Sequence, residues 1–522
     1  MTTPVLDVLV VGAGPVGTAL AIDLARRGRT VRIVEKAEHA FDGSRAKGIQ
    51  PRTLEVLEDL GVLDEVLARG SEYPPLGIHL GPVTVPWRMM RSAQAGGDVP
   101  FPNTWLIPQF RTDGALRNRL RTLGVAVEFD CELVELTEAA EVVTASVTTQ
   151  HGIETITARY IVGADGGGSV VRKQIGIDFV GSTDEADRIL IVDAGVEGNL
   201  SRDRWHVWPG LGGRFVGSCP LPHSDLFQWM IRLAPDESPP IDETQITECI
   251  RKRTGNKRLA VRDITWKSVF RPNIRLAQSY RCGHVLIAGD AAHVHTPAGA
   301  QGLNTGIQDA YNLGWKLGQV LAGAPQELLD TYESERRPIA AGVLGLSTKK
   351  YRGLGKLDPS SIRRGRDEQQ LALNYRGGPL APITAERTAT LHVGDRAPDA
   401  LLRDDDGQPV RVFDLYRGPH FTAVAYGERA AGELQSLTWP TGGAPLRRVA
   451  INAESASVDQ ELFDHSAGFK TNYGLTGDTL LLVRPDGYLA GIASRDMLTR
   501  TRSAVRMLTP PVQTAVTEES QS

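Results

Sequence analysis

The sequence predicts a mixed α/β (α+β) protein of two or three domains, and three observations lead to this prediction. The chain has 522 residues, too many for one ordinary hydrophobic core. In the first half, apolar runs that end in glycines alternate with helical patterns. Between Phe179 and Lys267 the pattern changes to the period-two alternation of antiparallel strands.

Composition excludes several classes of partner. A net charge of −4 gives no basic surface for nucleic acid or for an anionic membrane. The four cysteines form no CxxC pair, so neither structural zinc nor a disulfide framework is expected, and a reducing cytoplasm suits them. The apolar stretch Val5–Val11 is seven residues long and continues into glycines, as a strand does, not a signal peptide or a membrane span. We therefore expect a cytoplasmic protein.

The first element is a βαβ unit in LDVLVVGAGPVGTALAIDLARRGRTVRIVEK. Its glycines form GxGxxG: Gly12 allows the tight turn, Gly14 lets the backbone approach a pyrophosphate, and Gly17 lets helix and strand pack closely. The helix start then offers free N–H groups to phosphates. Glu35 closes the second strand, 23 residues after Gly12, where it can accept both hydroxyls of an adenosine ribose. The residues predicted to bind a dinucleotide here are Gly12, Gly14, Pro15, Val16, Gly17, Glu35 and Lys36.

Two later strands also end in glycine motifs. One runs through Tyr160–Val162 and precedes Asp165-Gly166, and the other runs through His284–Ala288 and precedes Gly289-Asp290. A nicotinamide dehydrogenase holds its cofactor mainly through the first half of such a fold. Three glycine-punctuated strand ends indicate instead a long cofactor that is contacted along its whole length, which favours FAD.

Together these motifs resemble the single-component (class A, para-hydroxybenzoate-hydroxylase-like) FAD-dependent aromatic monooxygenases. The segments PAGAQGLNTGIQDAYNLGWKL and LLDTYESERRP are similar to the branch that contains the aromatic polyketide hydroxylases and rifampicin monooxygenase. The resemblance is good from Val5 to about Pro338 and weaker beyond. It implies a Rossmann-like FAD-binding domain, an antiparallel-sheet substrate domain and a thioredoxin-like C-terminal domain.

The resemblance also implies roles for individual residues. Asp290 would bond a ribityl hydroxyl, and the helix that begins near Gly302 would direct its positive end at the N1–C2=O edge of the flavin. Ala300 departs from the branch, which usually has glycine there. The other residues implied in cofactor binding are Arg45, near the pyrophosphate and the opening of the flavin site, Gln109, Asp165, Pro297 in the loop over the ring, Leu303 and Asn304. Arg45 and Pro297 come closest to a catalytic role, and no catalytic base is identified.

The chemistry implied is hydroxylation of a polycyclic, polyketide-type phenol, as in antibiotic biosynthesis. NADPH or NADH would bind transiently and deliver hydride, and the reduced flavin would react with O2 to give a C4a-hydroperoxide that oxygenates an aromatic carbon. The chain has no second GxGxxG followed by an acid, which disfavours the common two-dinucleotide Baeyer–Villiger enzymes.

The strands between Phe179 and Lys267 are predicted to line the aromatic-substrate site on one face of a sheet. The substrate residues suggested are Trp205, Phe215, His223 and Gln228, although for each aromatic residue packing of the domain core is the more frequent outcome. His293 and His295 lie on a loop without a neighbouring carboxylate, so they are interpreted as loop-shaping residues, not metal ligands.

The C-terminal third begins at Leu391, after the Gly- and Pro-rich stretch LNYRGGPLAP. No cysteine follows Cys282, so dithiol chemistry is excluded there, and a structural or homodimer-contact role is expected. The predicted divisions are residues 1–73, 103–176 and 277–340 for the FAD-binding domain, 74–102 and 177–276 for the substrate domain, 341–390 for a helical linker region and 391–510 for the thioredoxin-like domain.

Three functional hypotheses remain open. The first is the aromatic hydroxylase, with an aromatic small molecule and O2 as partners. The second is the same scaffold performing Baeyer–Villiger insertion, epoxidation or ring opening. The third, from another class, is a flavin-binding protein without oxygenase activity.

Overall fold

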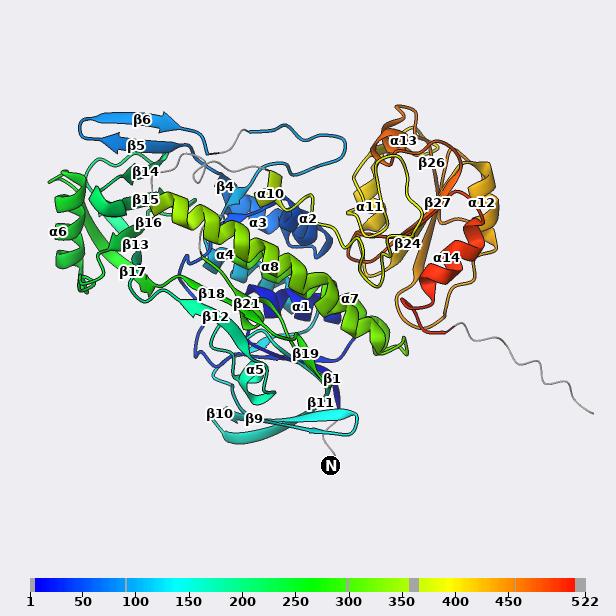
Figure 1. Cartoon of the computed structure of the whole chain (residues 1–522), viewed down its shortest axis with the longest axis horizontal. Coiled ribbons are helices and arrows are strands. Elements are labelled where there is room, and N and C mark those ends of the chain that lie inside the picture. Colours follow the sequence, from blue (N-terminus) through cyan, green and yellow to red (C-terminus); the bar gives the residue numbers. More distant parts are fainter. Residues whose placement is uncertain (1–4, 90–91, 297–299, 356–365, 456, 512–522) are drawn as a thin grey trace, which may run out of the picture.

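The structure is a computed structural model that describes residues 5–89, 92–296, 300–355, 366–455 and 457–511. Figure 1 shows three bodies in a row: a sheet with helix α6 at one end, a central body, and a smaller α/β body at the other end. The long helix α8 (Glu327–Gly355) lies across the central body. Within these described residues, no helix is both long and apolar enough to cross a membrane.

The central body is built on an eight-stranded sheet. Its main strands run in the order β19 (Arg281–Cys282), β20 (Val285–Ile287), β11 (Gly152–Gly163), β1 (Leu6–Val11), β2 (Val31–Val34) and β8 (Val127–Glu128), and β10 (Val142–Thr149) and β9 (Glu132–Ala139) extend it beside β11. Strands β20, β11, β1, β2 and β8 pair in parallel. The residues Val8–Val11 are buried, as expected of a continuous apolar run in a parallel sheet that is covered on both faces.

Helices connect and cover these strands. Helix α1 (Pro15–Ala25) packs against both α4 (Gln109–Thr122) and α7 (Gly302–Val320), and α7 packs against α8. The remaining elements of this body are α2 (Pro51–Asp59), α3 (Leu63–Arg69), α5 (Val170–Gln174), the short sheet β3 (Gly48–Ile49), β7 (Trp105–Leu106) and β4 (Ser71–Glu72), the short sheet β12 (Phe179–Thr183), β18 (Asn273–Ala277) and β21 (His293–Val294), the turn η2 (Gly289–Ala291) and α10 (Arg366–Gln369).

The second body is a seven-stranded sheet in which most neighbours are antiparallel. Its order is β17 (Ala260–Phe270), β13 (Arg188–Glu197), β16 (Phe227–Leu233), β15 (Val216–Pro220), β14 (Trp205–Trp208), β5 (Leu76–Leu80) and β6 (Val83–Trp87). One face packs its alternate residues, among them Val192, Trp229 and Ile231, against Ile246 and Ile250 of α6 (Glu243–Thr254). The opposite face is turned toward the central body.

The third body has its own core and a five-stranded sheet. The order is β26 (Gln460–Leu462), β25 (Leu446–Ile451), β24 (Phe421–Tyr426), β27 (Thr479–Val483) and β28 (Leu489–Ala493), with α11 (Val412–Tyr416), α12 (Glu428–Gln435), α13 (Gly468–Asn472), α14 (Met497–Val505) and the hairpin β22 (Leu401–Arg403) and β23 (Pro409–Arg411) around it. The architecture is the mixed α/β fold with a thioredoxin-like C-terminal domain that the sequence predicts.

A buried ionic cluster joins the third body to the central one. Glu335 of α8 pairs with Arg484 at 2.6 Å and with Lys316 of α7 at 2.7 Å. Arg484 also pairs with Asp486, in the turn between β27 and β28. All four side chains are almost completely buried, so this joint between the two bodies lies in the interior of the protein and not at its surface.

Candidate active site

The glycine loop between β1 and α1 is tightly packed on one side and open on the other. Gly12 has φ of 101°, and a Cβ there would lie 2.5 Å from the carbonyl oxygen of Ala164. At Gly14, by contrast, a Cβ would meet nothing within 4 Å. Helix α1 begins without a side-chain cap, so its first N–H groups face this open space. Such a loop could hold a pyrophosphate.

Glu35, at the end of β2, is half-buried and bonded to the loop. Its Oε2 accepts from the N–H of Ala13 at 2.9 Å, and its Oε1 accepts from the N–H of Ala37 at 3.1 Å. A carboxylate has about four acceptor positions, so two remain for ribose hydroxyls. Lys36 is exposed beside it.

Three segments far apart in sequence meet at the side chain of Val16. A Cβ at Gly289 would lie 2.8 Å from Val16, and a Cβ at Gly306 would lie 2.6 Å from it. Glycine is therefore required at both positions if the start of α1, the Gly289-Asp290 turn and α7 are to meet. The start of α1 lies more than 270 residues before the other two segments in the sequence, and the structure brings it together with them.

Asp290 lies in a recess. Its side chain is exposed, yet burial by the surrounding protein raises its pKa, against the opposing charges of His293 and Arg45. A group that is both accessible and desolvated belongs to a concave surface. Arg45 is itself exposed, with its guanidinium carbon 5.6 Å from the centre of the Phe41 ring.

The start of α7 is held by the side chain of Asn304. This amide donates to the carbonyl oxygens of Gly48 at 2.8 Å and Ala300 at 2.6 Å, and its oxygen accepts from the N–H of Gln50 at 2.8 Å. Helix α7 has no side-chain cap, so the backbone N–H groups at Gly302 and Leu303 are the ones that could meet a ligand. Pro297 lies outside the described residues.

Ala300 has φ of 53°, in the left-handed region that favours glycine. The departure from the branch's usual glycine therefore adds backbone strain just before α7.

Asp165 has one oxygen that still needs a partner. Its Oδ2 accepts from the N–H groups of Val170 at 2.7 Å and Val171 at 3.2 Å. Its Oδ1 is buried and has no hydrogen-bond partner among the described residues. Since buried acceptors are normally paired, this oxygen fits a ligand hydroxyl.

Gln109 begins α4 and accepts from the N–H of Ala46 at 3.3 Å. Its amide nitrogen lies 3.4 Å from Oδ2 of Asp113, a residue that sequence analysis missed. Asp113 is buried, its Oδ1 has no partner in the described chain, and burial raises its pKa to about 7. In the sequence, the only signal for Asp113 was an acidic residue on the face of a helix that is buried.

The face of the seven-stranded sheet toward the central body carries a row of polar and aromatic residues. Asp193 of β13 lies opposite Gln228 of β16 and Trp266 of β17, and Cys219 of β15 lies on the other side of Gln228. The pairing of His206 with Ser218 places Trp205 next to Cys219 in the same row. Two of the expected substrate residues, Trp205 and Gln228, are thus brought together.

The other two expected substrate residues lie elsewhere. Phe215 precedes β15 and, by the same alternation, lies on this face two rows away from Gln228. His223 lies in the turn between β15 and β16, and its Nε2 is 3.0 Å from the carbonyl oxygen of Gly70. The aromatic residues Phe227 and Trp229 pack against α6, so for them the core interpretation is the correct one.

Sequence analysis also missed the residues that meet this row from the central body. Ser44 donates to Asp193 through both its N–H, at 2.7 Å, and its Oγ, at 2.5 Å. The amine of Lys47 bonds the amide oxygen of Gln228 and lies 4.4 Å from the centre of the Trp205 ring. Only their adjacency to Arg45 in sequence could have pointed to them.

His293 has a carboxylate partner, which corrects the sequence interpretation. Its Nε2 lies 2.6 Å from Oδ2 of Asp309 in α7, and Arg336 of α8 donates to Oδ1 of the same carboxylate at 2.7 Å. The partner comes from 16 residues further along the chain, so local sequence did not reveal it. No group of three or more His, Cys, Asp or Glu in the described residues is arranged to hold a metal ion.

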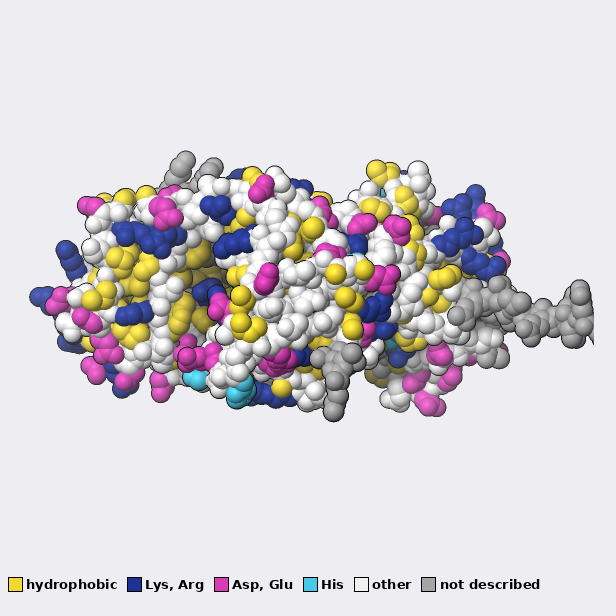
Figure 2. All heavy atoms as spheres, turned by 90° about the horizontal axis from the view of Figure 1, so that it is seen from below, with side chains coloured by type: hydrophobic (Ala, Val, Ile, Leu, Met, Phe, Trp, Pro, Cys, Tyr) yellow, Lys and Arg dark blue, Asp and Glu magenta, His cyan; other side chains and the backbone are white. Residues whose placement is uncertain are grey.

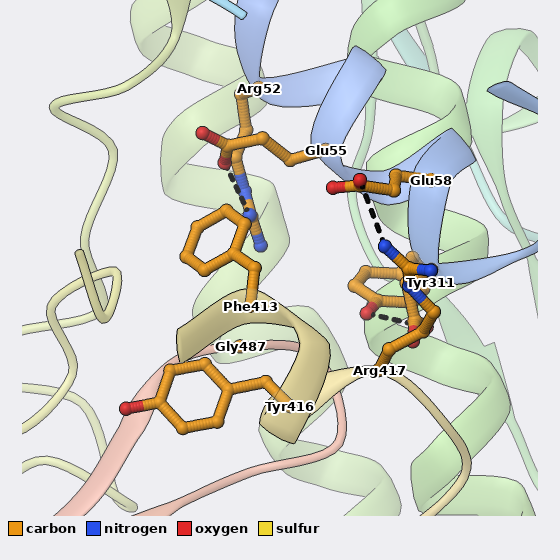
Figure 3. Close-up of a pocket in the computed structure, with 9 residues that line it drawn as sticks. Arg52, Glu55, Glu58, Tyr311, Phe413, Tyr416, Arg417 and Gly487 are labelled. Atoms are coloured by element: carbon orange, nitrogen blue, oxygen red, sulfur yellow. Dashed lines mark hydrogen bonds and ion pairs between the residues drawn. The ribbon is translucent and has the colours of Figure 1, made fainter. Parts of the chain in front are cut away.

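A small cavity lies between α2, α7 and α11 at the joint with the third body (Figure 3). Arg52, Glu55, Glu58 and Arg417 line it, and their charges are largely paired with one another or with other residues of the joint. Its volume is about 30 Å³, enough for one or two water molecules and too small for an aromatic substrate. Figure 2 shows instead a broad hollow lined by hydrophobic side chains in the part of the molecule that carries the seven-stranded sheet.

Comparison with known proteins agrees with this arrangement. A family model described as "FAD binding domain" matches residues 5–347. A flavin-dependent monooxygenase from Mycobacteroides abscessus is 40% identical over 503 residues, which are 93% of this chain and 96% of that protein. The structure of the anhydrotetracycline hydroxylase OxyS from Streptomyces rimosus is 31% identical with a TM-score of 0.73, over 98% of this chain and all of that one. The structure of aklavinone-11 hydroxylase with FAD and aklavinone is 25% identical with a TM-score of 0.80, over 97% and 100%.

Proposed function

Since this chain belongs to the FAD-binding class A aromatic monooxygenases, close to the polyketide hydroxylases, we propose that it hydroxylates a polycyclic, polyketide-type phenol with NADPH or NADH as reductant. The observation that carries the proposal is the row of Asp193, Gln228 and Trp205 facing Ser44 and Lys47. This row presents an aromatic and polar surface to the flavin-binding domain. Such a surface suits a flat, oxygen-rich ring system.

The residues present fit FAD. The open space at Gly14, the uncapped start of α1 and the two free acceptor positions of Glu35 suit a pyrophosphate and an adenosine ribose. The unpartnered Oδ1 of Asp165 and the recessed carboxylate of Asp290 suit hydroxyl groups. When bound, FAD supplies the acceptance of hydride and the activation of O2.

The residues of the chain itself would bind and orient the cofactor and the substrate, and would exclude water from them. With FAD bound, the uncapped start of α7 would offer N–H groups and the positive end of the helix dipole to the flavin, where they would stabilise negative charge. Asn304 fixes this helix start against Gly48 and Ala300. The sheet face opposite would hold the aromatic substrate and exclude water from it.

The proposal is tested by following NADPH and NADH oxidation, O2 uptake and product mass with a panel of polycyclic phenols and quinones. We expect a substrate that accelerates NAD(P)H oxidation and gains one oxygen atom from ¹⁸O2 on an aromatic carbon. A product in which the label lies in a ring-inserted ester or an epoxide would replace hydroxylation with another outcome on the same scaffold. Oxidation that yields only hydrogen peroxide with every compound would contradict the proposal.

A further inference from the structure

Lys47 carries a buried amine that makes no ion pair among the described residues. Its side chain belongs to a residue that is 8% exposed, and its amine has one hydrogen-bond acceptor among the described residues, the amide oxygen of Gln228. The face of Trp205 covers it at 4.4 Å. An ammonium group offers three donors, and a buried ammonium is costly unless it is paired and fully bonded.

The nearest carboxylate does not fill this need. Each oxygen of Asp193 accepts one hydrogen bond from Ser44, at 2.7 and 2.5 Å, and no ion pair joins Asp193 to Lys47 within the described part of the chain. The amide nitrogen of Gln228 is a donor, and it donates to the carbonyl oxygen and the Oγ of Ser44. The charged or titratable groups that face Lys47 are therefore the carboxylate of Asp193 and the thiol of Cys219, and burial lowers the pKa of Lys47 in spite of them.

Lys47 also lies between the proposed flavin site and the seven-stranded sheet. The next residue, Gly48, packs so closely on the loop before α7 that a Cβ there would lie 3.0 Å from that of Ala300. On the sheet side, the half-buried rings of Trp205 and Tyr73 lie 5.9 Å apart. The indole N–H of Trp205 is buried and has no acceptor among the described residues, so it is a further donor at this position that lacks a partner.

We propose that the Lys47 amine binds the ionised oxygen of the substrate's phenol or enol, so that the preferred substrates are acidic phenols. This inference deepens the proposed function and rests on it for the identity of the reaction. The phenolate supplies the missing negative charge, and the aromatic ring lies against Trp205. Lys47 thereby selects for a substrate with an acidic hydroxyl at one defined position.

The step is a proton transfer only. A neutral phenol gives its O–H proton to the unprotonated Lys47 amine; the O–H bond breaks, an N–H bond forms, and a phenolate–ammonium pair remains. A phenol that arrives already ionised pairs with the protonated amine. In both cases the negative charge raises the electron density of the ring at the ortho and para carbons, where an electrophilic oxygen is accepted.

The test uses the FAD-loaded protein and alizarin, a polycyclic phenol whose absorption moves to longer wavelength on ionisation. We expect wild-type protein to bind alizarin as the phenolate at a pH where free alizarin is still mostly protonated, lowering its apparent pKa by at least one unit. Lys47→Met should abolish this shift and weaken binding at least ten-fold, whereas Lys47→Arg should retain ionised binding. The matched control is Lys267→Met, in the same sheet but exposed and opposite Val192, which should behave as wild type.

FAD content and the spectrum of the oxidised flavin report folding in every variant; Lys47→Gln replaces Lys47→Met if the latter loses FAD. The inference is overturned if wild-type protein shows no bound phenolate at saturating alizarin, or if Lys47→Met and Lys47→Gln keep the shift. Hydroxylation of a panel phenol at unchanged rate in Lys47→Met would overturn the role of Lys47 and leave the proposed function standing. Phenolate binding that requires Lys47, without any oxygenated product from the panel, would support this inference and count against the proposed function.

Discussion

The Nε2 atom of His293 lies 2.6 Å from Oδ2 of Asp309, and both side chains are fully buried. The same carboxylate accepts from the N–H of Gly289 at 3.2 Å and from Nε of Arg336 at 2.7 Å. One side chain in the first half of α7 therefore fixes both the Gly289-Asp290 turn and helix α8. Although burial by itself raises the pKa of Asp309, the charges of His293 and Arg336 hold it below its usual value.

Asp309→Asn should destabilise the protein and loosen FAD. The amide keeps the shape but leaves the buried guanidinium of Arg336 without its counter-charge, and breaking a buried pair in this way costs about 3–5 kcal/mol. Urea unfolding of the purified holoprotein and its FAD-to-protein ratio measure both effects. Glu327→Gln, at an exposed position at the start of α8, is the control and should match wild type. Unchanged stability would show that the His293–Asp309–Arg336 contacts do not hold this region.

Asp290→Ala should purify with much less FAD. The carboxylate lies in a recess and has no other role among the described contacts of its side chain, so its loss should remove a charged hydrogen bond worth about 1.5–3 kcal/mol. That corresponds to roughly a ten- to hundred-fold higher dissociation constant for FAD. Fluorescence titration of the flavin-free protein gives the value, and Asp290→Asn should fall between alanine and wild type. A fully yellow Asp290→Ala protein would contradict the ribityl role.

Asp113 should make the stability of the flavin-free protein fall as pH rises. Burial raises its folded-state pKa from 3.8 to about 7, so between these values the folded state binds more protons than the unfolded state. The free energy of unfolding therefore decreases from about pH 4 to pH 7 and then levels off, by as much as about 4 kcal/mol.

Asp113→Asn should remove this dependence, which urea unfolding at pH 5 and pH 8 detects. The variant is expected to be more stable than wild type at both pH values, by a clearly larger margin at pH 8 than at pH 5, because most of the wild-type loss falls between them. An equal pH dependence in the two proteins would show that Asp113 is not desolvated as the structure implies.

Ala300 and Gly48 should be energetically coupled. Ala300→Gly should stabilise the protein by up to about 1 kcal/mol, because glycine removes the strain of a left-handed φ. Gly48→Ala should cost about 1–3 kcal/mol, because its methyl group would lie 3.0 Å from that of Ala300. In the double variant this clash disappears, so a thermal-unfolding cycle should show a favourable coupling between the two sites. Strict additivity would mean that the loop before α7 lies further from β3.

The sequence predicted the parts of the protein that depend on local chemistry. Glycine spacing after buried strands revealed the turns at Gly12, Asp165 and Asp290, because each needs a backbone that other residues cannot adopt. The class of flavin monooxygenase and the mixed α/β fold are confirmed by the comparisons, and the chain is an enzyme of this class, so the reading as a flavin-binding protein without oxygenase activity is not supported. NADPH versus NADH and the substrate stay predictions.

The remaining site residues come together through packing between distant parts of the sequence, which hydrophobic periodicity and motif spacing do not predict. Lys47 and Asp193 are 146 residues apart: strand pairing within one sheet brings Asp193 beside Gln228, and packing of the central body on that sheet brings Lys47 there. The carboxylate partner of His293 was not predicted from the sequence for the same reason. Alternation predicted that one sheet face lines the site, but it could not say which: Trp229 belongs to the core and Trp205 to the site face.

The segment from Ser44 to Gln50 makes alternate use of its two sides, with Ser44 and Lys47 against the sheet and Gly48 and Gln50 against the start of α7. A stretch of seven residues therefore belongs to two bodies at once. For protein engineering this means that transplanting the seven-stranded sheet of a relative onto this flavin domain, while keeping Ser44–Gln50, would leave Ser44 and Lys47 opposite a mismatched sheet. Chimeras that exchange the sheet together with this short segment should be the ones that inherit the donor's choice of substrate.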